Sequence, residues 1–169
     1  MATVNRDNFM EYSYDVFRRF NRQHAVVAAG VPGNFNAMTL GWGMMGNIWG
    51  HPGAALTIYV RPDRYTHEFL MKYDCFTVSF FPEAQRQDVM LLGTVSGRDR
   101  DKIAMTALTP KPVGETVGFE EAELTFVCRK ISAQPFALEH TPPHMAAVYA
   151  AAPTHTAFIG YIEDAFGEI

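Results

Sequence analysis

Two apolar runs separated by a tight-turn sequence constrain the fold of this chain more than any other feature. Residues 26–31 and 35–40 flank Pro32-Gly33-Asn34, and a turn of this composition between two extended runs predicts a β-hairpin. The second run then changes into Gly41-Trp42-Gly43. Glycines beside a tryptophan let the backbone approach a flat ligand closely. This break therefore predicts either a ligand-binding loop or an indole that plugs the end of a barrel.

Further apolar runs predict more strands, and polar or proline-containing segments separate them. The expected strands cover residues 24–31, 35–40, 54–60, 76–81, 122–131 and 155–163. Helices are expected over residues 65–73 and from Pro82 to a stop at Gly93. Because regular helices between successive strands are missing, a doubly wound parallel sheet is excluded. About six short strands protect their edges best by closure, which predicts a mainly β protein with a barrel and short peripheral helices.

Three segments show no clear pattern. Residues 4–20 fit helical spacing better than alternation, residues 110–118 are predicted to be a linker rich in proline and glycine, and residues 133–154 to be irregular. Neither a repeat nor a domain boundary interrupts the 169 residues, so a single domain over 1–169 is expected.

Charge and hydropathy exclude several kinds of partner. A formal net charge of -4 offers no overall electrostatic footprint for nucleic acid or an anionic membrane. No run approaches the roughly 20 apolar residues of a membrane span, and the N-terminus lacks the apolar region of a signal peptide. A cytoplasmic protein is therefore expected. Cys75 and Cys128 lie alone in apolar runs and are interpreted as buried thiols.

Four cations gather in two predicted loops. Arg61 and Arg64 lie in the first loop, and Arg98 and Lys102 follow a Ser96-Gly97 pair in the second. Guanidinium and ammonium groups beside hydroxyl groups and free loop N–H groups are the donors that a phosphate needs. The alternative is a solvated charge run in which neighbouring aspartates pair with the arginines.

The remaining motifs do not indicate a metal site, a nucleophilic catalyst or a dinucleotide-binding turn. His140 and His144 have a metal-compatible spacing, but the prolines between them argue against a helix, so no metal site is expected. Neither a G-x-S-x-G elbow nor a G-x-G-x-x-G turn after a strand is present. His155 is interpreted as either a structural histidine or the wall of a cavity.

Four blocks in the same order resemble the flavin reductase-like family, in particular its flavoredoxin-type branch. The blocks are NAMTLGWG at 36–43, YVRPDRYTHEF at 59–69, FTVSFFPE at 76–83 and LGTVSGRDRDK at 92–102. The chain departs from the family at Gly41, where serine is frequent, and at Met44-Met45. The resemblance implies an FMN-binding split β-barrel, usually a homodimer with flavin near the subunit interface.

The resemblance also assigns residues by position. It implies that the flavin ring is lined by Asn36, Met38, Thr39 and Trp42, and that the phosphate and ribityl chain are reached by Arg61, Arg64, Tyr65 and Thr66. A second phosphate-side block would consist of Ser96, Gly97, Arg98 and Lys102, and His155 matches a position near the ring in some members.

The implied activity is an FMN-dependent transfer of hydride from NAD(P)H to flavin, with a protein or small-molecule electron acceptor. Because the flavin performs the redox chemistry, no catalytic side chain is assigned. One alternative is a flavoredoxin-like electron-transfer protein that does not oxidise NAD(P)H, and another is a ligand-binding barrel without redox turnover. Residues 133–154 match the family poorly and are interpreted as a cover for the ring.

Overall fold

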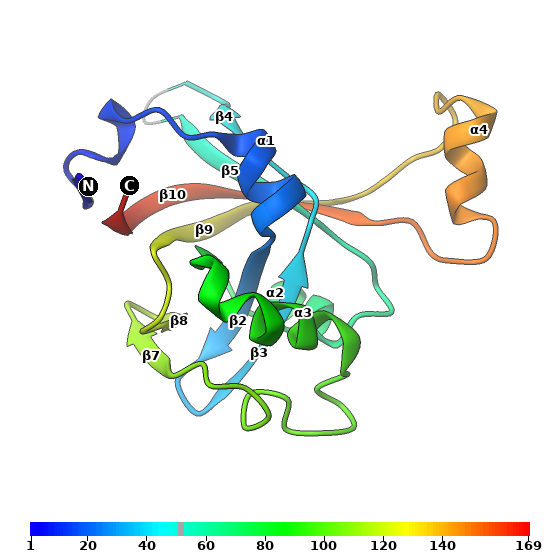
Figure 1. The fold of residues 1–169 in the computed structure, drawn as a ribbon. Helices are drawn as coiled ribbons and strands as arrows, with labels where there is room; N and C mark the ends of the chain where they lie inside the picture. Colours follow the sequence, from blue (N-terminus) through cyan, green and yellow to red (C-terminus); the bar gives the residue numbers. More distant parts are fainter. Residues whose placement is uncertain (51–52) are drawn as a thin grey trace.

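Antiparallel strands dominate the computed structural model, which describes residues 1–50 and 53–169 (Figure 1). The strands of the main sheet are β1 (Thr3–Val4), β2 (Ala25–Val31), β3 (Asn34–Leu40), β4 (Gly43–Asn47), β5 (Ala54–Val60), β6 (Cys75–Phe80), β9 (Leu124–Pro135) and β10 (Thr156–Glu168). They pair in the order β3-β2-β6-β9-β10-β5-β4, and β1 pairs with β10. A separate hairpin consists of β7 (Pro110–Val113) and β8 (Thr116–Phe119).

The sheet curls because its two edge strands are neighbours in the sequence. β3 and β4 lie at opposite ends of the strand order, yet only Gly41 and Trp42 join them. The edges of the sheet are therefore held together at this point, which a flat sheet does not allow. Within the described residues no ladder joins β3 to β4, so the barrel is split along this seam. The predicted mainly β split barrel is confirmed.

Short helices surround the barrel (Figure 1). They are η1 (Phe9–Glu11), α1 (Val16–Arg18), η2 (Arg19–Gln23), α2 (Tyr65–Lys72), η3 (Glu83–Gln85) and α3 (Arg86–Thr94). α2 and α3 pack against β2 and β3, which places the start of α2 and the end of α3 beside the seam. Among the described residues, no helix has the length and apolarity needed to cross a bilayer.

Strand β2 is buried on both faces from Ala25 to Gly30. Val27 belongs to the cluster inside the barrel, whereas Val26 and Ala28 pack with Val89 and Leu92 of α3 on the outside. Such double burial explains why residues 26–31 form a continuous apolar run. The hairpin therefore holds β3 firmly between the barrel and α3.

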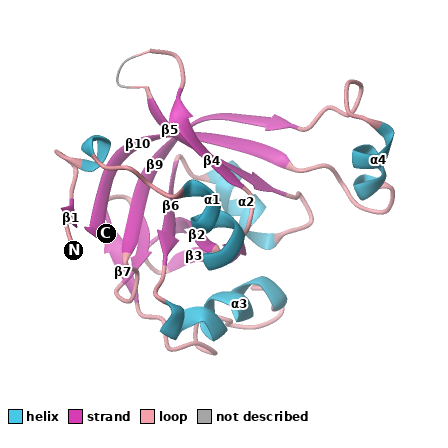
Figure 2. Cartoon of the chain, turned by 45° about the horizontal axis from the view of Figure 1, so that its top comes forward, coloured by secondary structure: helices cyan, strands magenta, loops and turns pink. Residues whose placement is uncertain are grey.

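An arm projects from the barrel (Figures 1 and 2). The ladder between β9 and β10 reaches the pair Pro135 and Thr156, and α4 (Pro143–Ala146) with η4 (Ala147–Tyr149) stands beyond it. The prediction that residues 133–154 are irregular is therefore wrong in part, because β9 continues to Pro135 and two helical turns follow.

Several other predicted elements need correction. Residues 110–118 are not a linker: they form most of the β7–β8 hairpin, with Gly114 in the left-handed region at its turn (φ 55°). Residues 4–20 hold short helical turns rather than one helix, and α3 continues one residue beyond Gly93.

Gly43 begins strand β4 rather than ending a ligand loop. A Cβ at Gly43 would lie 2.3 Å from the ring of Phe20, so this glycine makes room for an aromatic side chain.

Candidate functional site

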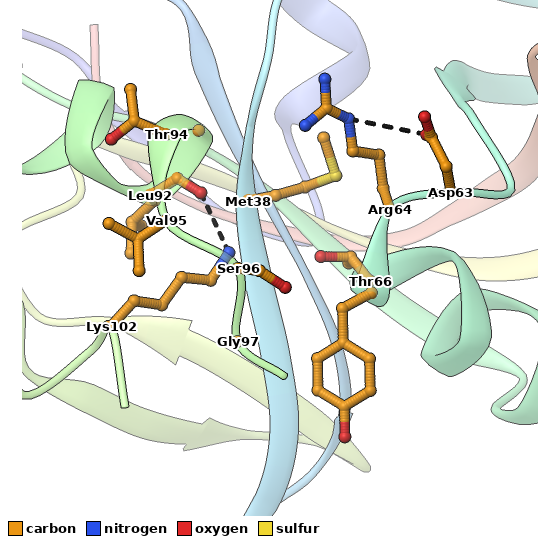
Figure 3. A pocket seen from close by; sticks show the side chains of 12 residues that line it. Met38, Asp63, Arg64, Thr66, Leu92, Thr94, Val95, Ser96, Gly97 and Lys102 are labelled. Atoms are coloured by element: carbon orange, nitrogen blue, oxygen red, sulfur yellow. Dashed lines mark hydrogen bonds and ion pairs between the residues drawn. The ribbon is translucent and has the colours of Figure 1, made fainter. Parts of the chain in front are cut away.

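Two adjoining pockets lie beside the seam. The cationic pocket, about 120 Å³, is enclosed by β3, the start of α2, the end of α3 and the loop after α3, including Ser96, Gly97 and Lys102 (Figure 3). The aromatic pocket, about 400 Å³, is lined by β3, the Gly41-Trp42 link, the end of β5 and His155. Met38, Arg64 and Gly93 line both pockets. The two pockets therefore form one groove.

Lys102 is the central charge of the cationic pocket. Its side chain is only 4% exposed, and its Nζ donates a hydrogen bond to the Leu92 carbonyl oxygen at the end of α3 (2.9 Å; Figure 3). Burial, with Arg64 nearby, lowers the pKa of Lys102 to about 8. The described residues supply no carboxylate partner for this ammonium. A bound anion would relieve this cost of burial.

The start of α2 adds further donors. Arg64 is the N-cap residue, and no side chain caps the helix, so the first N–H groups point out of the helix without a side-chain acceptor. Asp63 pairs with Arg61 at 2.9 Å and more loosely with Arg64 at 3.8 Å. The alternative expectation, that neighbouring aspartates pair with the arginines, is therefore correct for Asp63. This pairing leaves the charge of Lys102 without a carboxylate partner among the described residues.

Gly97 lets the loop after α3 close over β3 and α2. A Cβ at Gly97 would lie 2.2 Å from Asn36 Oδ1, so a larger residue would push the loop away. The Asn36 side chain is buried and donates from Nδ2 to Thr66 Oγ1 (2.7 Å). This contact ties β3 to the first turn of α2 directly behind the pocket wall.

The aromatic pocket is bounded by stacked rings. The Trp42 indole and the His155 imidazole lie with ring centroids 4.4 Å apart and planes at 26°. His155 Nδ1 also hydrogen-bonds the Tyr149 hydroxyl of the arm (2.8 Å). Burial, together with Arg61, lowers the pKa of His155, which favours the neutral ring near pH 7. Because one indole face is covered, only the other face and the edge of Trp42 are open to a ligand.

The structure brings together most of the residues that the resemblance assigned. The groove is lined by Met38, Thr39, Trp42, Arg61, Arg64, Tyr65, Thr66, Ser96, Gly97, Lys102 and His155. Asn36 lies behind Thr66. Arg98 points elsewhere: it pairs with Glu68, donates to the Asp63 carbonyl oxygen (3.2 Å) and lies over the Tyr65 ring.

The sequence does not single out every residue near the groove. Gly93 was interpreted only as a helix stop, yet it lines both pockets, and a Cβ there would lie 2.9 Å from Thr39 Oγ1. Val148 of the arm lines the aromatic pocket, and Tyr149 of the arm hydrogen-bonds His155 from outside that lining. The sequence predicts that the segment 133–154 covers the ring, but its lack of periodicity gives no signal for these two residues in particular. In the part of the chain that the structure describes, no three His, Cys, Asp or Glu residues are grouped to hold a metal ion.

Solved structures share this fold. Flavoredoxin from Methanosarcina acetivorans has a TM-score of 0.68 and 22% identity over 93% of this chain and 74% of that chain. The FMN-binding protein from Thermus thermophilus with bound p-hydroxybenzaldehyde has a TM-score of 0.69 and 21% identity over 93% and 82% of the two chains. A split barrel domain protein from Shewanella frigidimarina has a TM-score of 0.68 and 16% identity over 86% and 67%. These low identities show the fold alone.

No curated protein sequence matches the chain. The family assignment rests instead on the sequence model described as "Flavin reductase like domain", which matches residues 17–168. This match covers most of the chain and contains both pockets. The chain therefore belongs to the flavin reductase-like domain family.

Proposed function

We propose that this protein is an FMN-binding oxidoreductase of the flavin reductase type. The observation that carries the proposal is the buried Lys102 ammonium, which has a carbonyl partner and a neighbouring Arg64 but no carboxylate among the described residues. A phosphate monoester brings about 1.5 to 2 negative charges at neutral pH, which two cations and a helix start match well.

The residues of the groove fit FMN in order along its length. Lys102 and Arg64 would hold the phosphate, and the first N–H groups of α2 with the Ser96 hydroxyl would add hydrogen bonds. Met38 lies where the two pockets meet, and Trp42 would border the flat ring in the aromatic pocket. Bound FMN would supply the redox chemistry, accepting hydride from NAD(P)H and passing electrons to an acceptor.

The open aromatic pocket supports NAD(P)H as the reductant. Its volume of about 400 Å³ and its half-exposed Trp42 leave a mouth beside the proposed ring position, and a reductant needs access to one face of the ring. Neutral His155, with one ring nitrogen engaged by Tyr149, would offer its other nitrogen to a polar group of a ligand in this pocket.

The experiment mixes purified protein with micromolar FMN and then with NADH or NADPH under anaerobic conditions. We expect bound flavin absorbance and its bleaching by at least one of the two nucleotides. Absence of both bound flavin and NAD(P)H-dependent flavin reduction would contradict the proposal.

A second candidate is an electron-transfer protein that holds FMN without oxidising NAD(P)H. Similarity to flavoredoxin from Methanosarcina acetivorans favours it. Stopped-flow mixing separates the two, because a pure carrier would keep its FMN oxidised in the presence of NADH and NADPH and bleach only with a protein donor or dithionite.

The family resemblance further supports one flavin-binding domain over residues 1–169 and a homodimer, and a cytoplasmic location is proposed with them. Light scattering after gel filtration tests the dimer: a mass near twice 18.9 kDa is expected. A monomer at micromolar concentration, with and without FMN, would contradict it.

A further inference from the structure

An apolar recess adjoins the aromatic pocket. It measures about 830 Å³ and lies between α1, η2, β4 and the chain that follows β9 (Figure 2). It shares Gly41, Trp42 and Tyr59 with the aromatic pocket but no residue with the cationic pocket. The aromatic pocket therefore lies between the cationic pocket and the apolar recess. The apolar walls of the recess include Phe17, Phe20, Trp42, Met44, Met45 and Phe136.

The recess offers few polar groups to a ligand. None of the described residues that line it is charged, and its polar side chains are those of Asn21 and Tyr59 and the indole N–H. The Tyr59 hydroxyl is already engaged, because it donates to Met44 Sδ (3.5 Å). Phe17 is 88% exposed and Met44 is 60% exposed. Exposed apolar side chains around a hollow gain free energy when an apolar ligand covers them, so the recess is suited to an apolar chain.

The polar groups lie on the other side of Trp42, in the aromatic pocket. Arg61 and His155 line that pocket, and the Tyr149 hydroxyl hydrogen-bonds His155 Nδ1 (2.8 Å). When this hydroxyl donates to Nδ1, the proton of the neutral imidazole lies on Nε2, which can donate to a carbonyl oxygen. The aromatic pocket is thus suited to a flat ring that carries carbonyl groups. A ligand that passes over Trp42 and Tyr59 would fill both hollows.

We infer that the electron acceptor of this protein is a quinone with an apolar side chain, whose ring enters the aromatic pocket and whose chain lies in the apolar recess. The inference rests on the proposed function, because the electrons come from NAD(P)H through bound FMN. The volume of the recess, about 830 Å³, lies within the range of small-molecule sites, roughly 300–1,000 Å³.

The reaction balances with the reactants already named. NAD(P)H supplies a hydride, which carries two electrons and one proton, and the solvent supplies a second proton. The quinone is reduced to a quinol as its two carbonyl groups become hydroxyl groups, and NAD(P)H is oxidised to NAD(P)⁺.

The first test measures quinone reduction by the FMN-loaded protein under anaerobic conditions, with NADH or NADPH as the reductant. Decylubiquinone, which carries a saturated chain, is compared with the same benzoquinone head group without the chain. We expect kcat/KM to be about 30-fold higher for the quinone with the chain, because several methylene groups are transferred from water into the recess.

A charged side chain in the wall of the recess should remove this preference. Met44→Glu should reduce the ratio of the two kcat/KM values to about threefold or less, because a carboxylate there disfavours burial of the chain. Met71→Glu is the matched control: it makes the same change at an exposed methionine of α2 that lines neither the groove nor the recess, and it should retain the full ratio. Equal ratios in the wild-type protein and Met44→Glu would overturn the inference.

Hydrogen exchange locates the chain independently of turnover. In the oxidised, FMN-loaded protein, decylubiquinone should slow the exchange of backbone amides over residues 16–21 and 41–45, which line the recess. The head group without the chain should leave the exchange over residues 16–21 unchanged. Identical exchange patterns with the two quinones would overturn the inference.

The alternative occupant of the recess is a second copy of the chain. Light scattering tests it: Met44→Glu should keep the molecular mass of the wild-type protein, and dissociation into a lighter species would assign the recess to a subunit interface and overturn the inference. Failure of the proposed function gives a different result. FMN binding and its bleaching by NAD(P)H, without any preference for the chain, would overturn the inference alone, whereas absence of flavin binding would overturn both.

Discussion

The two ends of the groove are built on different physical principles. The cationic pocket is small and enclosed, with Lys102 and Thr66 almost fully buried and packed by Gly97 and Asn36. The aromatic pocket is larger, its Trp42 is 50% exposed, and part of its wall comes from the projecting arm. One end is fixed by the barrel and its helices, whereas the other depends on a segment outside the barrel.

Because of this difference, we expect one end of the groove to set the affinity for the ligand and the other end to accept ligands of different shape. A buried charge gains strongly from its correct partner, since few waters compete for it. Half-exposed rings gain moderately from any flat ligand and tolerate changes in its shape. We therefore expect the phosphate to determine how tightly FMN is held, and the aromatic end to determine which molecules reach the ring.

Replacing Lys102 with methionine should cause the largest effect. Met keeps the length of the side chain but removes the ammonium, so FMN affinity should fall about 100-fold, the upper range for a buried charge-assisted contact. Riboflavin, which lacks the phosphate, should bind as it does to the wild-type protein. Calorimetric titration with both flavins measures this.

Lys111→Met is the matched control for this substitution. Lys111 also pairs through its ammonium, at 2.9 Å from Glu120, but on the separate β7–β8 hairpin. It should leave both affinities unchanged. An equal loss of FMN and riboflavin affinity in Lys102→Met would show that the lysine supports the fold of the groove rather than the phosphate.

The pH dependence of FMN binding should follow the titration of the same lysine. Without ligand the pKa of Lys102 is about 8, against an ordinary value of 10.5. Phosphate raises that pKa, so FMN binding takes up a proton above pH 8, and affinity should fall about tenfold between pH 7 and pH 9. Titrations in buffers of different ionisation enthalpy measure the proton uptake. Lys102→Met should show neither effect, and a flat profile in the wild-type protein would contradict the assignment.

The stability of the flavin-free protein should change in the opposite direction. Between pH 8 and 10.5 the unfolded chain binds a proton that the folded chain has released. The cost of burying the charged lysine is therefore fully present below pH 8 and disappears as the pH rises towards 10.5. The unfolding free energy of the wild-type protein should therefore rise relative to that of Lys102→Met as the pH increases from 8 towards 10.5.

Local sequence signals account for the barrel and for the cationic end. The strand over residues 54–60 was predicted with its observed bounds, because its apolar run and the proline-containing sequences on either side are local signals. Arg64 and Lys102 were identified because their neighbours formed recognisable blocks. In both cases the information lies within about ten consecutive residues.

The features that could not be predicted from the sequence depend on contacts between residues that lie far apart in the chain. Phe20 explains why Gly43 is a glycine, and Glu68 explains where Arg98 points, yet neither partner is near in sequence. The β7–β8 hairpin carries two prolines on β7, which are usually poor strand formers, and it forms because β8 is buried against the barrel. Only the assembled fold supplies these reasons.

Trp42→Ala tests the aromatic end and should have a moderate effect. Loss of a ring contact is worth about 0.5–1.5 kcal/mol, so FMN and riboflavin affinities should both fall about fivefold. The equal loss distinguishes this end from the cationic pocket. Trp49→Ala removes the other tryptophan, which is exposed and outside the groove, and should change neither affinity. If Trp42→Ala weakened the binding of FMN but not of riboflavin, Trp42 would lie at the phosphate end of the groove, contrary to the proposal.

Arg98→Ala should have the smallest effect, although Arg98 stands in a block that the resemblance assigns to the phosphate. Its guanidinium is already paired with Glu68 and the Asp63 carbonyl oxygen, so FMN affinity should change by less than about twofold, whereas Arg64→Ala should weaken it about tenfold. The lost surface pair should cost less than about 1 kcal/mol of unfolding free energy.

Glu68→Gln provides the decisive comparison, because it releases Arg98 from its partner. If Arg98 were a phosphate ligand, Glu68→Gln would tighten FMN binding and Arg98→Ala would match Arg64→Ala. Unchanged affinity in both variants would instead show that Arg98 contributes no charge that holds the phosphate.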